Sequence, residues 1–283
     1  MRIPPRLVPL IEYGIIQSVV RPLLSGKEAQ VYLVESGGEL RAAKVYKSVQ
    51  ERSFRNRSSY TEGRQVRNTR DQRAMGKHSR YGREQEEAAW NSIEVDTIYK
   101  LDAAGVRVPK PFAFVDGVLV MECIGGSDGG VALRISDCHL DKEQGLVVCD
   151  QILAEVVKML CADVVHADLS VYNVLLEERG PVIIDFPQSI GASKNPHARK
   201  ILLRDVANIT SFFRFGRAPE ELRYGYEMWD LYERGQLAPD TVLTGKFDIP
   251  EHLVDADILL LEMQQIEEDE ALAEFGEDLD FDS

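Results

Sequence analysis

The chain has 283 residues, 44% of them hydrophobic, and a formal net charge of −14 at pH 7. This length suits one large domain or two small ones, each with its own core, and no apolar run is long enough to cross a membrane. The acidic balance argues against overall affinity for nucleic acids. The four cysteines lack the Cys-x-x-Cys spacing of a zinc site, and with no signal-peptide pattern at the N-terminus we expect a cytoplasmic protein.

The hydrophobic pattern predicts a mostly β first half and a mostly helical second half. Residues 1–16 are expected to form a helical lead-in that prolines interrupt. The predicted strands cover residues 17–24, 30–35, 39–46, 111–115 and 117–123. The predicted helices cover residues 85–104, 142–163, 195–214, 219–233 and 253–266. In the second helix, a stripe at helical spacing predicts a core face: Ile152, Val156, Met159 and Leu160.

The segment VVHADLSVYNVLL, followed by VIIDFPQ, carries the strongest functional pattern. In a protein-kinase type of site, an Asp accepts the substrate proton, an Asn five residues later holds a metal, and an Asp on the following turn holds the metal that bridges the phosphates. Asp168, Asn173 and Asp185 have this arrangement, and His166 completes an H-x-D pattern. The apolar run before Asp185 predicts a buried strand. An ordinary solvated loop with a chance match is the alternative.

A kinase-type site also needs a cation on the phosphates and a carboxylate that positions it. The run RAAKVYK places Lys44 on a strand-like segment that resembles the V-A-I-K strand of kinases. The following predicted helix can direct Glu94 toward Lys44, with Glu87 as the competing acid. A lysine on a solvated strand face is the plain alternative.

Upstream of Lys44, the sequence LLSGKEAQVYLV predicts two strands joined by a Ser-Gly-Lys turn. Gly26 lets the backbone approach an anion closely, and Ser25, Lys27 and nearby N–H groups can bind phosphate oxygens. The segment is neither a G-x-G-x-x-G loop nor a Walker A motif, so an ordinary hairpin turn remains an alternative.

The segment GVLVMECIG predicts a buried strand that enters a glycine-containing link. A two-lobed kinase has its hinge at such a link. The backbone groups of Glu122 and Ile124 are then expected at the adenine edge, with Met121 at the back of the pocket. A plain core strand is compatible with this role.

The charges are unevenly distributed. Residues 52–83 carry ten Arg or Lys residues against two acids, and residues 262–283 carry ten acids and no base. The basic block, part of an insert over about residues 48–84, is a solvated segment by default or a surface for RNA phosphates. Four arginines at three-residue intervals could share a helix face: Arg64, Arg67, Arg70 and Arg73. The acidic block is a solubilising tail, or a competitor with RNA for the basic block.

Taken together, these segments resemble the RIO family of atypical serine protein kinases. The segments that carry the resemblance are SGKEAQVY, AAKVYK, AGVRVPKP, GVLVMECIG, HADLSVYNVL, IIDFPQS and RDVANITSFF. The short stretch before the phosphate loop resembles the bacterial or archaeal type without a winged-helix domain, although D-F-P-Q resembles the other group.

The resemblance implies an α+β, bilobal protein-kinase-like fold, with a small mostly-β N-terminal lobe, a helical C-terminal lobe, no activation loop and no peptide-docking helices. The expected boundaries are 1–122 for the first lobe, 123–250 for the second and 251–283 for a helical and then acidic tail. Asp205 and Asn208 in RDVANI are expected to support the catalytic loop.

The resemblance also implies an ATP-dependent serine/threonine protein kinase that uses Mg²⁺, with Mn²⁺ as an alternative, and that phosphorylates a protein substrate and itself. Asp168 would take the hydroxyl proton, while Asn173 and Asp185 would hold the metal. In some family members the residue equivalent to Asp185 carries a phosphoryl intermediate. Lys44, oriented by Glu94, would contact the phosphates.

Two other functions remain open. One is a nucleotide-switched ATPase that binds RNA and acts as an assembly factor of the small ribosomal subunit. The other is a small-molecule kinase of the aminoglycoside-phosphotransferase type, which shares H-x-D-x-x-x-x-N; the SGKEA loop and D-F-P-Q favour the RIO family over it.

Overall fold

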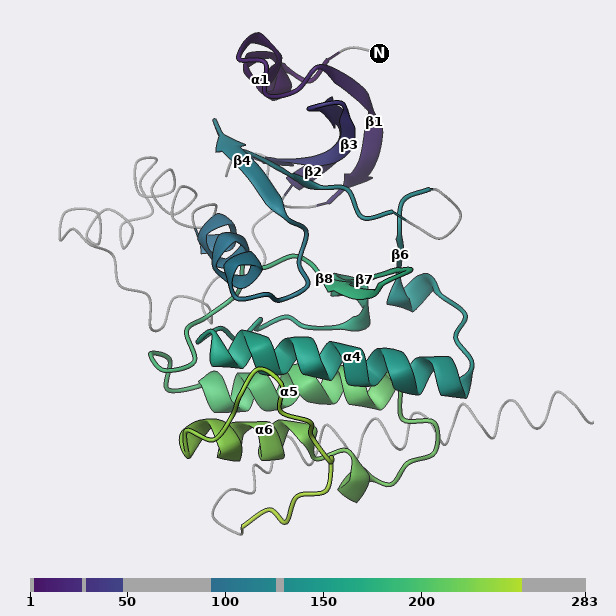
Figure 1. The fold of residues 1–283 in the computed structure, drawn as a ribbon, viewed down its shortest axis with the longest axis vertical. Helices are drawn as coiled ribbons and strands as arrows, with labels where there is room; N and C mark the ends of the chain where they lie inside the picture. The colour runs from purple at the N-terminus through teal and green to yellow at the C-terminus, as the bar shows by residue number, and fades with distance from the viewer. Residues whose placement is uncertain (1–2, 27–28, 48–92, 126–129, 251–283) are drawn as a thin grey trace, which may run out of the picture. The chain divides into compact units, whose positions relative to one another are not determined.

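The computed structural model describes residues 3–26, 29–47, 93–125 and 130–250. The chain divides into two compact units. Figure 1 shows the whole chain coloured by residue number. The first unit consists of Met1–Cys138 and Asn173–Ile190, and the second of His139–Tyr172 and Gly191–Ser283. The predicted boundary between the two lobes, at residue 122, stays a prediction. The first compact unit extends past this residue to Cys138 and also includes Asn173–Ile190.

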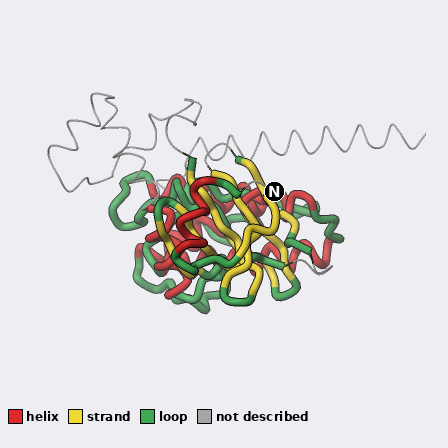
Figure 2. Tube along the Cα trace, turned by 90° about the horizontal axis from the view of Figure 1, so that it is seen from above, coloured by secondary structure: helices red, strands yellow, loops and turns green. Residues whose placement is uncertain are grey.

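A five-stranded antiparallel sheet forms the main part of the first unit. Its strands, drawn yellow in Figure 2, are β1 (Ser18–Ser25), β2 (Ala29–Ser36), β3 (Glu39–Tyr46), β4 (Pro111–Val115) and β5 (Val118–Glu122). Their order across the sheet is β1-β2-β3-β5-β4. The observed bounds lie within one residue of the five predicted strands, which are therefore confirmed.

Two tight turns set the register of this sheet. Gly37 and Gly38 join β2 to β3 with φ of 64° and 80°, and Asp116 and Gly117 join β4 to β5 with φ of 50° and 74°. A two-residue hairpin turn with positive φ at both positions matches the twist of the strands, and Gly-Gly and Asp-Gly adopt it at least cost. The Gly37-Gly38 turn therefore determines which side chains of β3 point to each face of the sheet.

The two faces of the sheet have different roles. One face packs on the N-terminal helices η1 (Pro5–Leu7) and α1 (Val8–Glu12), and its buried cluster contains Leu7, Leu10, Ile16, Tyr32, Val34, Ala43, Val45, Val118 and Val120. Since side chains alternate along a strand, Lys44 lies on the other face. Its cross-strand neighbour there is Leu119, and Ala42 pairs with Met121 on the same face.

Two further elements complete the first unit. Residues 93–103 are helical, whereas the predicted start of this helix lies outside the described residues. A small sheet with the order β6-β7-β8 consists of β6 (Leu133–Arg134), β7 (Val174–Glu177) and β8 (Gly180–Ile183), flanked by the short helices η2 (Ile135–Asp137) and η3 (Val171–Asn173). The sequence predicted the strand before Asp185, but not β6 or β7.

The second unit is helical. Figure 1 shows α4 (Lys142–Cys161), α5 (Ala198–Phe212) and α6 (Tyr224–Glu233) packed together, with the short helix η4 (Pro219–Glu221) before α6. α4 begins with a capping box, in which the Asp141 carboxylate accepts from the Gln144 N–H at 2.8 Å and the Gln144 side chain accepts from the Asp141 N–H at 3.2 Å. The predicted stripe on α4 is buried and is confirmed as core.

Several expected features can be compared with the described residues. None of the described helices is long and apolar enough to cross a bilayer. All four cysteines are free thiols; Cys149 is buried, whereas Cys161 is exposed. Only residues 186–197 separate Asp185 from α5, which leaves no length for an activation loop and agrees with the predicted fold class. The predicted helix 253–266 lies outside the described residues.

Candidate active site

Lys44 on β3 lies between two carboxylates. Its Nζ donates to Glu94 Oε1 at 2.6 Å and to Asp185 Oδ1 at 2.7 Å. Glu94 is almost completely buried, with 1% of its side chain exposed, whereas 43% of the Asp185 side chain is exposed. The structure thus brings together three of the predicted site residues, which are separated by 50 and 141 positions in the sequence.

This pairing keeps Lys44 charged inside the first unit. Burial by itself would lower the pKa of Lys44, but attraction to Glu94 and Asp185 outweighs this effect and raises the pKa above its ordinary value. A permanent cation results, held on the face of the sheet that carries Ala42 and Met121. Such a charge can neutralise phosphate oxygens.

The helix 93–103 aims Glu94 at Lys44 because its inner face is apolar. Val95, Ile98 and Leu101 are buried on the same helix, and residues three and four positions apart share a face. Thr97, one turn after Glu94, shares a hydrogen bond of 2.9 Å with the Ser189 hydroxyl. The helix that carries Glu94 is therefore linked to the segment 185–189 directly through Thr97 and Ser189, and indirectly through Lys44, which binds both Glu94 and Asp185.

The sequence analysis missed the contact between Thr97 and Ser189. The helical spacing from Glu94 to Thr97 was a usable signal, because it places both residues on one face. The partner position in the D-F-P-Q-S segment had no such local signal.

The hairpin β7–β8 places Asn173 and Asp185 at one end. Val174 pairs with Ile183 in the ladder, and the Ile184 N–H donates to the Asn173 carbonyl at 3.0 Å. Asp185 follows directly and has a left-handed backbone with φ of 72°. For a residue other than glycine this conformation is strained, and it recurs at functional sites.

The donors at this end fit a magnesium ion. Mg²⁺ is commonly held by one or two carboxylates together with waters and substrate phosphates, and not by a cage of protein ligands alone. Asp185 offers a carboxylate and Asn173 an amide oxygen, and within the described ranges no group of three or more His, Cys, Asp or Glu side chains could hold a metal ion. The metal role of Asn173 and Asp185 stays a prediction.

The turn between β1 and β2 contains the predicted phosphate loop. Ser25 is exposed at the end of β1, and the Gly26 N–H donates to the Ala29 carbonyl at 2.9 Å. A Cβ added at Gly26 would meet only the Ala29 oxygen, at 3.5 Å, so the fold itself leaves room at this position. Lys47, which the sequence analysis did not identify, donates to the Gly26 carbonyl at 2.6 Å. The predicted Lys27 lies outside the described residues.

The end of β5 has the backbone pattern expected of an adenine edge. Met121 lies opposite Ala42, on the Lys44 face of the sheet. The Glu122 N–H donates to the Lys110 carbonyl at 2.8 Å, and the Ile124 carbonyl accepts from the Ala132 N–H at 2.9 Å. The Glu122 carbonyl and the Ile124 N–H, which are predicted to meet adenine, are an acceptor and a donor.

Asp168 belongs to the second unit, where it is exposed on a loop whose flanks are buried. Ala167 and Leu169 on either side are 2% and 1% exposed, and Ala167 has a φ of 67°. From α5, Asp205 Oδ2 accepts from the Ala167 N–H at 2.7 Å, and Asn208 Nδ2 donates to the Leu169 carbonyl at 3.1 Å. These are the contacts expected of the RDVANI segment, and they fix the backbone around Asp168.

Arg204, the first residue of this segment, adds a third contact. Its guanidinium donates to the Ala167 carbonyl at 2.7 Å and to Asp205 Oδ1 at 3.3 Å. Burial raises the pKa of Asp205 to about 7, although Arg204 and the backbone N–H groups work in the opposite direction. The carboxyl group that supports the loop therefore titrates near neutral pH.

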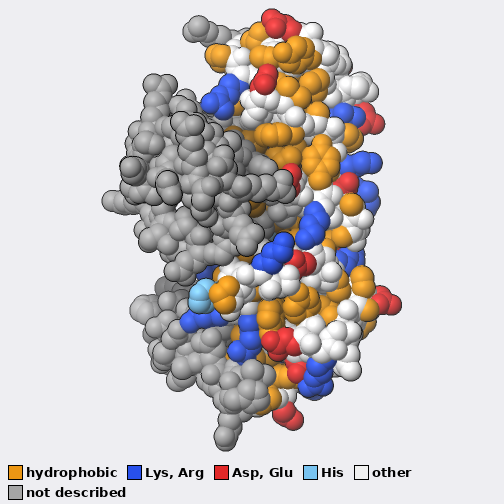
Figure 3. All heavy atoms as spheres, turned by 90° about the vertical axis from the view of Figure 1, so that its left-hand side faces the viewer, with side chains coloured by type: hydrophobic (Ala, Val, Ile, Leu, Met, Phe, Trp, Pro, Cys, Tyr) orange, Lys and Arg blue, Asp and Glu red, His pale blue; other side chains and the backbone are white. Residues whose placement is uncertain are grey.

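Some predicted features cannot be placed. Glu87, the four arginines of the basic block and the whole acidic block lie outside the described residues. On the described part of the face in Figure 3, lysine and arginine side chains lie among acidic and hydrophobic ones. The predicted RNA surface stays a prediction.

Fold and site together define a protein of the protein-kinase-like class. A family model described as the RIO domain matches residues 30–224, and the chain belongs to the RIO family. It is 32% identical over 207 residues to the "RIO-type serine/threonine-protein kinase Rio1" of Haloferax volcanii, a match that covers 72% of this chain and 66% of the relative. It is 30% identical to the human "Serine/threonine-protein kinase RIO1", covering 73% of this chain and 35% of that protein.

The chain thus spans less than two thirds of the length of these curated relatives. Among solved structures, it is similar to a Rio2 kinase complex with ADP/Mg²⁺ and phosphoaspartate from Chaetomium thermophilum, with a TM-score of 0.56 and 17% sequence identity. That match covers 94% of this chain and 75% of the other. The likeness supports the kinase-like fold.

Proposed function

We propose that this chain is an ATP-dependent protein kinase that transfers the γ-phosphoryl group to serine hydroxyls, including its own. The observation that carries the proposal is the position of Lys44 between Glu94 and Asp185, at 2.6 and 2.7 Å. A lysine held by one carboxylate beside a second, exposed carboxylate is the arrangement that kinases use at the nucleotide phosphates. The names of the relatives support the same activity.

In this proposal the nucleotide extends over the first unit. The adenine edge pairs with the Glu122 carbonyl and the Ile124 N–H, with Met121 behind the ring. Ser25, Gly26 and Lys27 cover the phosphates, and Lys44 neutralises part of their charge. Asn173 and Asp185 hold Mg²⁺, or Mn²⁺ in its place, and the ion supplies further charge stabilisation at the phosphates.

Asp168 acts on the acceptor. Its carboxylate takes the proton of the serine hydroxyl, while the serine oxygen bonds to the γ-phosphorus and the bond from that phosphorus to ADP breaks. Phosphoryl transfer asks little covalent chemistry of the protein, so the rate gain comes mostly from positioning and charge stabilisation. The hydrogen bonds from Asp205 and Asn208 to the loop provide the positioning for Asp168.

A second route uses Asp185 as the first acceptor. Its exposed carboxylate would attack the γ-phosphorus, ADP would leave, and water would then hydrolyse the acyl phosphate to inorganic phosphate. This route makes the protein a nucleotide-switched ATPase, and the phosphoaspartate named for the Chaetomium protein supports it by analogy. RNA or a ribosomal particle would be the partner, bound through the basic block.

The test is turnover of radiolabelled ATP by wild type, Asp185→Asn and Asp116→Asn. Asp116 is a matched control, because it is also an aspartate with left-handed backbone (φ 50°) but lies in the exposed β4–β5 turn. We expect Asp116→Asn to match wild type and Asp185→Asn to lose about a hundredfold or more. Acid-stable label on serine supports the kinase route. Tritium incorporated at Asp185 on reduction with tritiated borohydride, which releases the phosphate and leaves homoserine, supports the ATPase route. Wild type without ATP turnover, with or without added RNA, refutes both.

A further inference from the structure

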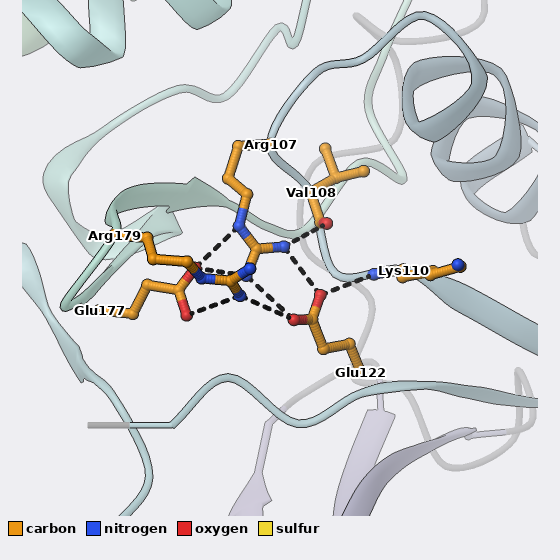
Figure 4. Close-up of polar contacts among 6 residues, drawn as sticks. All are labelled: Arg107, Val108, Lys110, Glu122, Glu177 and Arg179. Atoms are coloured by element: carbon orange, nitrogen blue, oxygen red, sulfur yellow. Dashed lines mark hydrogen bonds and ion pairs between the residues drawn. The ribbon is translucent and has the colours of Figure 1, made fainter. Parts of the chain in front are cut away.

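Four charged side chains of the first unit form a closed ring, in which only Glu122 also belongs, through its backbone, to the residues assigned to the nucleotide. Figure 4 shows Arg107, Glu122, Glu177 and Arg179, which we call the Arg107 ring. Arg107 lies in the extended segment before β4, Glu122 ends β5, and Glu177 and Arg179 lie at the turn of the β7–β8 hairpin. The ring joins three segments that are far apart in the sequence.

Arg107 is the centre of the ring. Its Nη1 and Nη2 bind the two Glu122 oxygens at 2.7 and 3.0 Å in a bidentate pair, and its Nε and Nη2 both bind Glu177 Oε1. Its Nη1 also donates to the Val108 carbonyl at 3.2 Å. Arg179 closes the ring, with 3.3 Å to Glu122 and 3.2 Å to Glu177. A planar guanidinium can make this set of contacts and an ammonium cannot.

The ring is partly shielded from water. Glu177 is 9% exposed, and Arg107 and Glu122 are mostly buried, whereas Arg179 is 70% exposed. Burial opposes ionisation of both partners, yet the hydrogen bonds between them raise the pKa of Arg107 and lower the pKa of Glu122. The pair therefore stays charged, and it is the shielded Arg107, more than Arg179, that holds the ring together.

Backbone hydrogen bonds connect the ring to both ends of the proposed nucleotide site. Ile183 lies two residues before Asp185, and its N–H donates to the Arg107 carbonyl at 3.0 Å. At the other side, the Glu122 N–H donates to the Lys110 carbonyl and the Lys110 N–H donates to Glu122 Oε2. The Glu122 side chain thus points into the ring, while its carbonyl is proposed to meet adenine.

We infer that Arg107 is a positioning residue for purine selectivity: its guanidinium ties Glu122 to the β7–β8 hairpin and fixes the distance between the adenine edge and the pair of Asn173 and Asp185. This inference rests on the proposed function. The Glu122 carbonyl and the Ile124 N–H distinguish adenine from guanine only if they stay in place relative to the bound phosphates. Without Arg107, the like charges of Glu122 and Glu177 repel each other and only the exposed Arg179 bridges them. The end of β5 then moves because Glu122 is no longer held.

The test compares binding of ATP, GTP and tripolyphosphate, each with Mg²⁺, by calorimetry for wild type, Arg107→Met, Arg107→Lys and Arg179→Met. For Arg107→Met we expect the Kd of ATP to rise about tenfold, equal to 1.4 kcal/mol, and the ratio of GTP to ATP affinity to approach one. Tripolyphosphate, which has no base, should bind within about twofold of wild type. Arg179→Met is the matched control, since it removes the exposed cation from the same two carboxylates, and it should keep wild-type selectivity.

Arg107→Lys keeps the positive charge but not the bidentate geometry, so it should retain only part of the preference for ATP over GTP. If Arg107→Met does not fold, Arg107→Lys takes its place in the comparison. The double variant Arg107→Met/Glu122→Gln should be no less selective than Arg107→Met alone, because both changes act on one contact. Equal weakening of ATP and tripolyphosphate would show a general loss of structure and overturn the inference, as would unchanged selectivity. Wild type that binds no ATP refutes the proposed function itself, and the inference with it.

Discussion

Replacing Lys44 by methionine should destabilise the protein before any nucleotide is considered. Glu94 is 1% exposed, its Oε1 binds Lys44, and within the described part of the chain its Oε2 has no hydrogen-bond partner. Removal of the cation leaves this carboxylate buried and uncompensated. Breaking a buried ion pair from one side costs about 3–5 kcal/mol. Asp185 adds less to the cost, because it is exposed enough to be hydrated.

The double variant Lys44→Met/Glu94→Met should recover most of this loss. Replacing both partners of a buried pair by apolar side chains of similar volume is often neutral or stabilising, so we expect a free energy of unfolding within about 1 kcal/mol of wild type.

The assay is urea unfolding followed by circular dichroism without nucleotide. Arg234→Met is a matched control: Arg234 and Asp230 also form a contact of 2.7 Å, but on the exposed side of α6. Exposed pairs contribute about 0–1 kcal/mol, so this variant should stay near wild type. The reasoning is wrong if Lys44→Met loses no more stability than Arg234→Met, or if the double variant is as unstable as the single one.

Four other outcomes follow from the same contacts and charges. Asp168→Ala should fold and bind ATP but lose about a hundredfold or more in phosphotransfer; unchanged transfer would remove Asp168 from the mechanism. Between pH 4 and 7, folded Asp205, with its pKa raised to about 7, holds a proton that the unfolded chain has released, so stability falls as pH rises through this window. Asp205→Asn should abolish this part of the slope in urea titrations, and an unchanged slope would contradict the assignment. Thr97→Val removes the hydrogen bond to Ser189 and should lower the free energy of unfolding by about 1 kcal/mol, whereas an equal stability would show that the contact contributes nothing. Deletion of residues 267–283 should tighten RNA binding at low salt through the loss of competing charge; equal RNA affinities of the deletion variant and wild type, measured at two salt concentrations, would refute this.

The fold could be predicted where the signal is local. The five strands of the main sheet are short runs rich in apolar residues, and the turns Gly37-Gly38 and Asp116-Gly117 separate β2 from β3 and β4 from β5. β6 has two residues and β7 has four. These strands exist because β6 pairs with β7 and β7 pairs with β8, and tertiary pairing of this kind has no local pattern.

The residues of the candidate site also differ in whether a local sequence pattern predicts their arrangement. The offset from Asp168 to Asn173 is a property of one loop, so the sequence displays it directly. The contacts of Lys44 with Glu94 and Asp185 span 50 and 141 positions, and only the resemblance to a family suggested them. The Arg107 ring had neither kind of signal: its contacts span 15 and 70 positions, and an Arg before a strand is ordinarily a surface residue.

A left-handed backbone position lies at one proposed catalytic acid, Asp185, and directly before the other, Asp168, and many contacts surround both positions. Asp185 itself has a φ of 72°, and Ala167, directly before Asp168, has a φ of 67°. Strained residues persist only where their surroundings over-determine them. Around Asp185 the constraint comes from Lys44, from the Ile184–Asn173 hydrogen bond and from Thr97 on Ser189. Around Ala167 it comes from α5, whose side chains bind both its N–H and its carbonyl. In each unit, then, the acid proposed for chemistry is held in place by contacts between neighbouring residues.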